Sequence, residues 1–298
     1  MRLGIDIGGT KTDAVAVDDV GALAQRVRLD TGFGSAAVIE TALAAVAGIG
    51  RLTALAPGDF ASIGVGVPGL VDSASGHVAH AVNLGVERLE LGLELERRLG
   101  AEVRVENDVN AAALGAYHLL GLTGTMAYLN LGTGLAAGIV ADGRLWRGAG
   151  GIAGEIGHIP VDPAGALCAC GQRGCLETVA SGSGVARMWP TEDPLPARAL
   201  FAAAAAGDPE AQAVTLTLAE GIAAAVRILV LTVDVDAVVI GGGLSHIGRP
   251  LLDAVEGVLS RWAETSPFLA SLALAERVRV VPEGSPVAAL GAALIGGS

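Results

Sequence analysis

All three cysteines of the chain fall within one short segment, CACGQRGCLE at 168–177. The spacing C-x-C-x₄-C gathers three thiols, and His158 lies ten residues before the first of them. Zinc in structural sites takes four nitrogen and sulfur ligands in a tetrahedron. We therefore predict a structural zinc held by His158, Cys168, Cys170 and Cys175. The simpler interpretation is three ordinary reduced cysteines.

Two carboxylates flank the predicted metal ligands. Glu155 precedes His158 by three residues, and Glu177 follows Cys175 by two. A metal would hold both carboxylates and the imidazole in one rigid wall, with the tautomer of the histidine fixed by the metal. Carboxylates accept hydrogen bonds from vicinal hydroxyls, so Glu155, His158 and Glu177 are predicted to bind a sugar. The metal would shape this site and stay out of the chemistry.

Two glycine-rich turns between strand-like runs are candidate phosphate loops. DIGGTK (6–11) carries a carboxylate, a hydroxyl and a lysine on one turn, and LGTG (131–134) offers a second turn. Glycines let backbone N–H groups approach phosphate oxygens, and a single carboxylate suits a hydrated Mg²⁺. The simpler interpretation of each is a plain hairpin turn. The predicted phosphate and magnesium residues are Asp6, Gly9, Thr10, Lys11, Thr133 and Gly134.

The segment Glu106-Asn107-Asp108 ends a strand-like run and begins a helical one. Phosphoryl transfer needs alignment, charge neutralisation and a base for the attacking hydroxyl. An aspartate at a strand–helix junction is rigidly placed and could accept that proton. Asn107 beside it could donate to and accept from sugar hydroxyls. The alternative is that Asp108 merely caps the helix.

A run of three glycines, Gly241, Gly242 and Gly243, follows the apolar segment DAVVI. Backbone without side chains could admit an adenosine there. A simple turn at the entry of a helix explains the same residues.

These residues must be positioned by alternating strands and helices. Their apolar patterns and glycine or proline boundaries are the signals. The predicted strands are 2–8, 12–18, 61–67, 102–108, 125–134, 135–143, 236–243 and 277–281; the predicted helices are 35–50, 89–100, 109–120, two within 197–232, 249–263 and one after Pro286.

One pattern occurs twice. GIDIGGTKTDAVAVDD (4–19) and YLNLGTGLAAGIVADG (128–143) both have the order strand, Gly-Thr-rich turn, strand, acidic turn. Asp6 falls opposite Asn130, and Gly8 opposite Gly132. Two related α/β halves with a ligand between them would explain the repetition; a chance similarity of two hairpins is the alternative.

Composition narrows the class of protein. The 298 residues are 52% hydrophobic with a net charge of −12, which suits a large aliphatic core and disfavours binding to a nucleic-acid backbone. No leader and no uninterrupted apolar run of membrane-spanning length is evident, so we expect a soluble protein without a membrane partner. The low, odd cysteine count fits a reducing, cytoplasmic compartment.

The motifs together resemble the ROK family of sugar kinases and sugar-responsive repressors. The resemblance runs almost end to end, and the cysteine segment with AGEIGH is its most specific part. The motifs, in order, are DIGGTK (6–11), VPGLVD (67–72), ENDVNAAALG (106–115), LGTG (131–134), GAGGIAGEIGH (148–158), CACGQRGCLE (168–177) and VVIGGG (238–243).

This resemblance implies an actin-like ATPase (ribonuclease H-like) fold with two similar α/β domains around a cleft. We expect residues 1–107 plus 286–298 to form the N-terminal domain, and 108–285 to form the C-terminal domain with the zinc loop. Asp108 would be the general base, and Asn107, Asp108, Glu155, His158 and Glu177 would contact the sugar. ATP and Mg²⁺ would lie at the two turns.

The activity implied is that of an ATP-dependent hexose kinase, with glucose and its 6-hydroxyl as the first expectation. Kinases for N-acetylmannosamine, N-acetylglucosamine and fructose share these motifs, and polyphosphate is a second candidate donor. Repressors of the family carry an extra N-terminal helix-turn-helix, for which a DIGGTK motif starting at residue 6 leaves no room. A non-catalytic sugar sensor and a structural ATP-binding protein are the other classes considered. Family habit suggests a homodimer.

The chain departs from the family pattern after the second turn. Family members commonly continue GTG with a glycine-rich run, whereas Ala136 and Ala137 stand here. Because alanine is costly where the backbone needs a positive φ, we predict a strand conformation at these positions.

Overall fold

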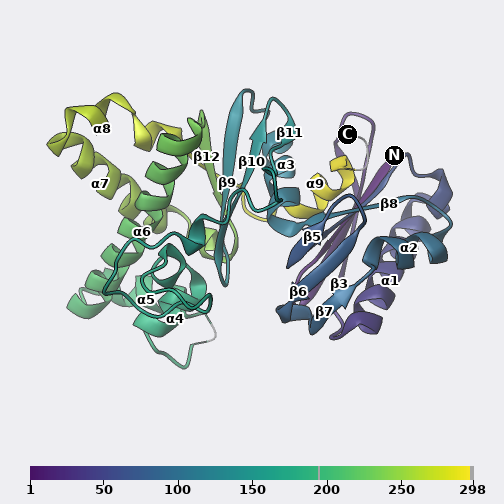
Figure 1. The fold of residues 1–298 in the computed structure, drawn as a ribbon, viewed down its shortest axis with the longest axis horizontal. Coiled ribbons are helices and arrows are strands. Elements are labelled where there is room, and N and C mark those ends of the chain that lie inside the picture. Colours follow the sequence, from purple (N-terminus) through teal and green to yellow (C-terminus); the bar gives the residue numbers. More distant parts are fainter. Residues whose placement is uncertain (194, 296–298) are drawn as a thin grey trace. The chain divides into compact units, whose positions relative to one another are not determined.

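The computed structural model describes residues 1–193 and 195–295 (Figure 1). The chain divides into two compact units and contains two five-stranded sheets. The first unit comprises Met1–Thr123, Gly138–Ala153 and the segment from Gly284 onward, and the second comprises Gly124–Ala137 and Gly154–Glu283.

The first unit is built on a five-stranded sheet of order β3-β2-β1-β4-β8. β1 pairs with β2, and β2 with β3, in antiparallel fashion, whereas β1, β4 and β8 run parallel. Parallel strands align their carboxyl ends at one edge, which is where ligands of open α/β sheets bind. The strands are β1 (Arg2–Ile7), β2 (Lys11–Val17), β3 (Leu23–Asp30), β4 (Ile63–Val67) and β8 (Val103–Asn107).

Helices lie on both faces of this sheet. On one face, α1 (Ser35–Thr53) packs against the strands, and α2 (Leu91–Leu99) joins the same core. On the other face, α9 (Val287–Ile295) covers β1 and β4 and also packs against α3 (Asp108–Leu119). A small antiparallel sheet completes the unit, with β5 (Leu70–Asp72), β6 (His77–Ala81) and β7 (Val86–Leu89) and the short 3₁₀ helices η1 (Pro57–Asp59) and η2 (Val82–Leu84).

Glycines allow α9 to approach its neighbours at backbone distance. A Cβ on Gly291 of α9 would lie 1.7 Å from the carbonyl oxygen of Ala111 in α3. A Cβ on Gly4 of β1 would lie 2.0 Å from the carbonyl oxygen of Ala289 in α9. The helix that begins at Asp108 is therefore held against the last helix of the chain without side chains between them.

The other five-stranded sheet, of order β11-β10-β9-β12-β13, repeats the first. In both, a hairpin is followed by a parallel crossover from its first strand, here from β9 to β12 and on to β13. This matching order confirms that the pattern found at 4–19 and 128–143 marks two related halves. The strands are β9 (Thr125–Leu131), β10 (Leu135–Ala141), β11 (Arg144–Leu145), β12 (Ala237–Gly241) and β13 (Val278–Val280).

Helices supply most of the second unit (Figure 1). The predicted helical region 197–232 is indeed two helices, because Gly207 takes a positive φ and the Asp208 side chain caps the second helix by accepting from the N–H groups of Glu210 and Ala211. The α-helices are α4 (Gly182–Met188), α5 (Pro196–Ala205), α6 (Pro209–Val233), α7 (Arg249–Thr265) and α8 (Pro267–Ser271); the 3₁₀ helices are η3 (Ile156–His158), η4 (Leu176–Thr178), η5 (Gly243–Ile247) and η6 (Leu274–Arg277).

The units divide after Thr123 rather than after residue 107, where the domain boundary was expected. The reason is that α3 packs against α9 of the first unit, and the segment Gly138–Ala153 returns to the same unit. Two helices, α1 and α6, are long and apolar enough to cross a membrane by composition. Both bury residues in the core of their own unit, as core helices do.

Candidate functional site

Asp108 is the first residue of α3, directly after β8. The helix cap is Asn107, whose Oδ1 accepts from the N–H groups of Val109 at 2.9 Å and Asn110 at 3.3 Å. The alternative that Asp108 is the capping residue is therefore wrong, although its Oδ1 shares the Val109 N–H at 3.0 Å. The Asn107 amide also donates to the carbonyl oxygen of Gly69 at 3.1 Å. Among residues 1–193 and 195–295, this amide has no second acceptor, so its other hydrogen is available to a ligand.

Asp6 lies at the end of β1 and is a neighbour of Asp108. Burial raises the pKa of Asp6 to about 8, and repulsion from Asp108 and then Asp13 adds to the shift. Asp13 stands opposite Asp6 in the β1–β2 register and is paired with Arg26 at 3.0 Å and with Arg28 at 3.5 Å. The first unit thus gathers carboxylates where a cation would relieve their repulsion.

The first predicted phosphate turn is a tight hairpin. The Gly8 N–H donates to the Lys11 carbonyl at 2.9 Å. A Cβ on Gly9 would lie 3.2 Å from the Cβ of Asn83, so η2 lies directly against the turn. Gly9, Thr10 and Lys11 are exposed, and the Lys11 ammonium forms an ion pair with Asp30 across the β2–β3 register.

A buried carboxylate to which no motif assigned a role supports the Asp108 junction. Glu106 is 2% exposed and pairs with Arg147, whose Nε and Nη2 each lie 2.7 Å from its Oε2. Its Oε1 accepts from the N–H of Asn107 at 3.0 Å and from the Asn110 amide at 2.9 Å. Glu106 therefore fixes both ends of the turn that presents Asp108.

In the second unit, the four predicted zinc ligands converge. One donor atom from each of His158, Cys168, Cys170 and Cys175 lies within 4.8 Å of the others. The His158 Nδ1 is 3.7 Å from the Cys168 Sγ, and the Sγ atoms of Cys170 and Cys175 are 3.6 Å apart. The prediction that these four side chains form one cluster is confirmed.

The chemistry of the cluster fits a zinc ion. Hydrogen bonds from Gln172 lower the pKa of the exposed Cys170 thiol to about 6, whereas burial, followed by the neighbouring sulfurs, raises the pKa of Cys175 to about 12. Sulfurs this close cannot all ionise unless a cation lies among them. Three thiolates and one imidazole are a common ligand set of structural zinc.

The two flanking carboxylates lie beside this cluster. Glu155 directly precedes η3, and Glu177 lies within η4. Glu155 is an exposed residue, yet partial burial of its carboxyl group raises the pKa; Glu177 adds repulsion, and His158 opposes the shift. The structure therefore brings Glu155, His158 and Glu177 together, as the wall predicted for a sugar requires.

The second predicted phosphate turn joins β9 to β10 and contains the exposed Thr133. The Gly132 N–H donates to the Gly134 carbonyl at 3.1 Å, and the carbonyls of Gly132 and Thr133 accept from the first two residues of α4 at 2.8 and 3.1 Å. Ala136 and Ala137 lie in β10, and neither has a positive φ. The prediction of a strand conformation there is confirmed.

Two packing constraints explain glycines at the first two positions of the run Gly241, Gly242 and Gly243. A Cβ on Gly241 would lie 2.1 Å from the Tyr128 hydroxyl. Gly242 has a φ of 81°, and a Cβ there would lie 2.6 Å from the Asn130 Oδ1. Gly243 begins η5 and has open space where a side chain would be. The run is thus partly a turn into a short helix, and it lies against the end of β9 that carries the Gly132–Gly134 turn.

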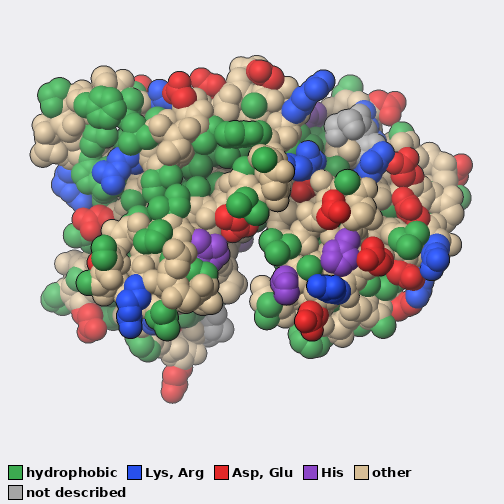
Figure 2. Space-filling model, viewed as in Figure 1, with side chains coloured by type: hydrophobic (Ala, Val, Ile, Leu, Met, Phe, Trp, Pro, Cys, Tyr) green, Lys and Arg blue, Asp and Glu red, His purple; other side chains and the backbone are tan. Residues whose placement is uncertain are grey.

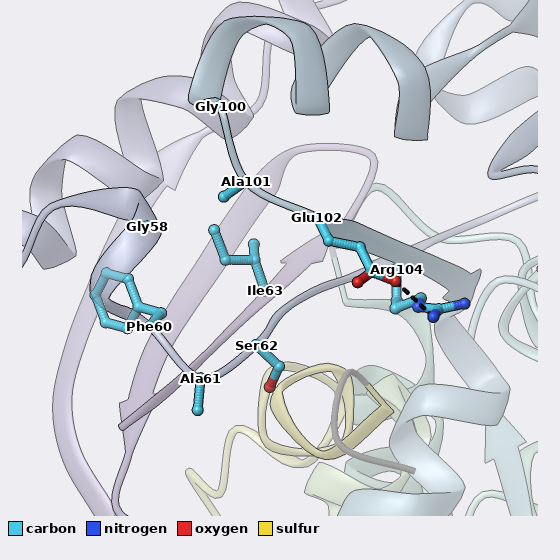
Figure 3. Close-up of a pocket in the computed structure, with 9 residues that line it drawn as sticks. All are labelled: Gly58, Phe60, Ala61, Ser62, Ile63, Gly100, Ala101, Glu102 and Arg104. Carbon is cyan, nitrogen blue, oxygen red and sulfur yellow. Dashed lines mark ion pairs between the residues drawn. The ribbon is translucent and has the colours of Figure 1, made fainter.

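The first unit also contains a pocket of about 220 Å³ that is separate from the candidate site residues (Figure 3). It forms where β4 and β8 begin, between Gly58–Ile63 and Gly100–Arg104, and holds a Glu102–Arg104 ion pair of 2.5 Å. The candidate site uses the opposite, carboxyl ends of these strands, at Asn107. This pocket is therefore not part of it.

Two sheets of matching order, each with a glycine-rich turn in its first hairpin, define an actin-like ATPase fold. The model of the ROK family matches residues 2–296, and the chain belongs to that family.

Individual relatives agree with this assignment. The chain is 33% identical over 275 residues to a glucokinase of Halalkalibacterium halodurans, covering 85% of this chain and 83% of the relative. It is 36% identical over 246 residues to an N-acetylmannosamine kinase of Citrobacter koseri, covering 80% of this chain and 82% of the relative. A ROK glucokinase of Streptomyces griseus, solved with glucose and AMPPNP, superposes with a TM-score of 0.79 at 31% identity, covering 99% of this chain and 98% of that one.

Proposed function

We propose that this chain is an ATP-dependent hexose kinase that phosphorylates the 6-hydroxyl of glucose. Its membership of the ROK family and its likeness to glucokinases along most of its length support an enzyme of this class. The observation that carries the mechanism is the position of Asp108, at the carboxyl end of β8 and beside Asp6.

In this mechanism Asp108 is the general base. It accepts the proton of the sugar hydroxyl as the hydroxyl oxygen attacks the γ-phosphorus of ATP; the new O–P bond forms, the bond to the β–γ bridging oxygen breaks, and ADP leaves. A bound Mg²⁺ would offset charge on the phosphates, and Asp6 would orient it. The phosphates would meet the turn residues Gly9, Thr10, Lys11, Thr133 and Gly134, and the adenosine would meet Gly241, Gly242 and Gly243.

The sugar would bind to the metal-braced wall. The carboxylates of Glu155 and Glu177 would accept hydrogen bonds from sugar hydroxyls, and the His158 nitrogen that does not bind the metal would be available to the ligand. Asn107 and Asp108 complete the contacts. Because an N-acetylmannosamine kinase is as similar to this chain as the glucokinases are, that amino sugar is the second candidate substrate.

A coupled ADP-release assay across glucose, N-acetylmannosamine, N-acetylglucosamine and fructose tests the activity, with polyphosphate as the competing donor. Glucose with ATP should give the highest kcat/KM. Asp108→Asn should lower kcat by about a hundredfold or more and leave sugar affinity within a few-fold, whereas Asp59→Asn, an exposed aspartate in η1, should behave as wild type. Sugar binding without turnover on any sugar would instead identify a sensor.

The surface and the cysteines support proposals for the assembly and the location of the protein. We propose a homodimer because α6 and α8 of the second unit expose Leu216, Leu231 and Phe268. Apolar side chains also gather on the face of the second unit that is seen at the upper left of Figure 2. Light scattering should give twice the mass of the 29.6 kDa chain. Reduced thiols in ligand geometry suit a cytoplasmic protein.

A further inference from the structure

The Glu177 carboxylate has a second partner besides the metal cluster. Its Oε1 lies 3.9 Å from the Cys168 Sγ. Its Oε2 accepts from the N–H of Leu135 at 3.0 Å. Leu135 is the first residue of β10 and directly follows the Gly132–Gly134 turn. One side chain therefore spans from the zinc ligands to the predicted phosphate turn.

The contact with the turn is close. A Cβ on Gly134 would lie 2.5 Å from the Glu177 Oε2, so a side chain at residue 134 would displace this carboxylate from its present position. Glu177 is half-buried, which shields its hydrogen bond from water. A hydrogen bond to an ionised acceptor is roughly twice as strong as one between neutral groups.

The rest of the zinc-bearing segment holds the same strand. A Cβ on Gly157, next to the ligand His158, would lie 2.0 Å from the Leu135 carbonyl oxygen. Two residues further along β10, the N–H of Ala137 donates to the Gly154 carbonyl at 2.8 Å. The return strand of the turn is thus packed against both ends of the segment that carries the metal ligands.

We propose that Glu177 is a positioning residue for the phosphate turn, through which the zinc cluster stabilises nucleotide binding as well as sugar binding. This inference rests on the proposed function, in which the turn receives ATP phosphates. Glu177 fixes the Leu135 N–H, and thereby the orientation of the turn's own N–H groups before the nucleotide arrives. Binding then loses less conformational freedom. The sequence motifs alone had connected Glu177 and the metal only with the sugar.

The test measures binding of AMPPNP with Mg²⁺ by calorimetry, without sugar, so that no turnover is needed. Glu177→Ala should weaken AMPPNP binding by about tenfold, the size expected for a charge-assisted hydrogen bond. Glu177→Gln should restore affinity to within about threefold of wild type, because its amide oxygen accepts from the same N–H. Glu155→Gln, a change of the other wall carboxylate, should leave AMPPNP affinity within about twofold while weakening glucose binding. Zinc content, measured on each variant, should remain one per chain.

A second measurement uses the wild-type chain and covers the case in which Glu177→Ala does not fold. Removing the metal with a chelator should weaken AMPPNP binding, and added Zn²⁺ should restore it. The inference is overturned if AMPPNP affinity is unchanged in Glu177→Ala or after metal removal, or if Glu177→Gln is as weak as Glu177→Ala. Wild-type protein that fails to bind AMPPNP at all would instead overturn the proposed function, and the inference with it.

Discussion

Replacing Arg147 with methionine should lower the free energy of unfolding, by an amount that depends on the burial of its ion pair with Glu106. The substitution keeps much of the aliphatic volume of Arg147 and removes the cation from Glu106. Glu106 is 2% exposed and Arg147 is 36% exposed, and two arginine nitrogens meet the same carboxylate oxygen at 2.7 Å. The variant leaves a buried carboxylate whose remaining donors are the N–H of Asn107 and the amide of Asn110.

Breaking a fully buried ion pair on one side costs about 3–5 kcal/mol. Because a third of Arg147 is exposed, water can enter on its side and solvate Oε2, and Oε1 keeps both of its donors. We therefore expect a loss of about 2–3 kcal/mol, below the range for a fully buried pair. In the double variant with Glu106→Gln, the buried charge is gone as well, so the combined loss should fall short of the sum by about 1–3 kcal/mol.

Equilibrium urea unfolding measures these free energies, with the m-value as a check that the transition itself is unchanged. Arg144→Met is the matched control, since Arg144 is an exposed residue of β11, and it should stay within about 0.5 kcal/mol of wild type. An Arg147→Met chain as stable as this control, or a double variant whose losses add fully, would refute the argument that the pair carries a buried charge.

Three further outcomes are expected. Gly291→Ala should lower the stability measured by thermal unfolding by about 1–3 kcal/mol, because its Cβ would lie 1.7 Å from the Ala111 carbonyl oxygen. The control Gly257→Ala in α7 should be neutral or stabilising, because its Cβ would meet only a flexible arginine at 3.8 Å. Equal effects of the two substitutions would contradict the packing argument. The raised pKa of Asp6, about 8 against an ordinary 3.8, keeps its proton bound in the folded chain while the unfolded chain loses it, so stability should fall as pH rises from about 4 to about 8. In Asp6→Asn the Tm should fall less as the pH rises, and at pH 8 it should be higher than that of wild type. A variant less stable than wild type at pH 8 would disprove the argument from the raised pKa of Asp6. A chain ending at Glu283 should fail to give the cooperative thermal transition of wild type, because α9 is lost; a normal transition would show that α9 is dispensable.

Much of the fold could be predicted because the decisive signals are local. Apolar runs bounded by glycine or proline mark most strands and helices, and Gly207-Asp208-Pro209 marks the break between α5 and α6. The edge strand β3 was missed, since Leu23–Val27 is mostly exposed and shows no buried alternation. The small sheet of β5, β6 and β7 was missed because its strands are short and interrupted by polar residues.

The candidate site was predictable where its residues are adjacent in sequence. The zinc ligands fall within eighteen residues, from His158 to Cys175, and the structure brings them together. The pair of Glu106 and Arg147 was not predictable, because forty-one residues separate the partners. Strand alternation places Glu106 on the same side of β8 as the exposed Arg104. Glu106 is covered only by the later segment that contains Arg147. The bond from Glu177 to Leu135 is likewise a tertiary contact, across forty-two residues.

The close approach of α9 to β1, β4 and α3 has a consequence for synthesis on the ribosome. The first unit begins with residue 1 but is completed by a helix that starts at Val287. At about 5–20 residues per second, its early strands wait tens of seconds for that helix. During this time the glycine-lined face of the sheet and one side of α3 stay uncovered. We expect the nascent chain to need a chaperone over this interval, and a C-terminal nonsense mutation to be as damaging as an early one.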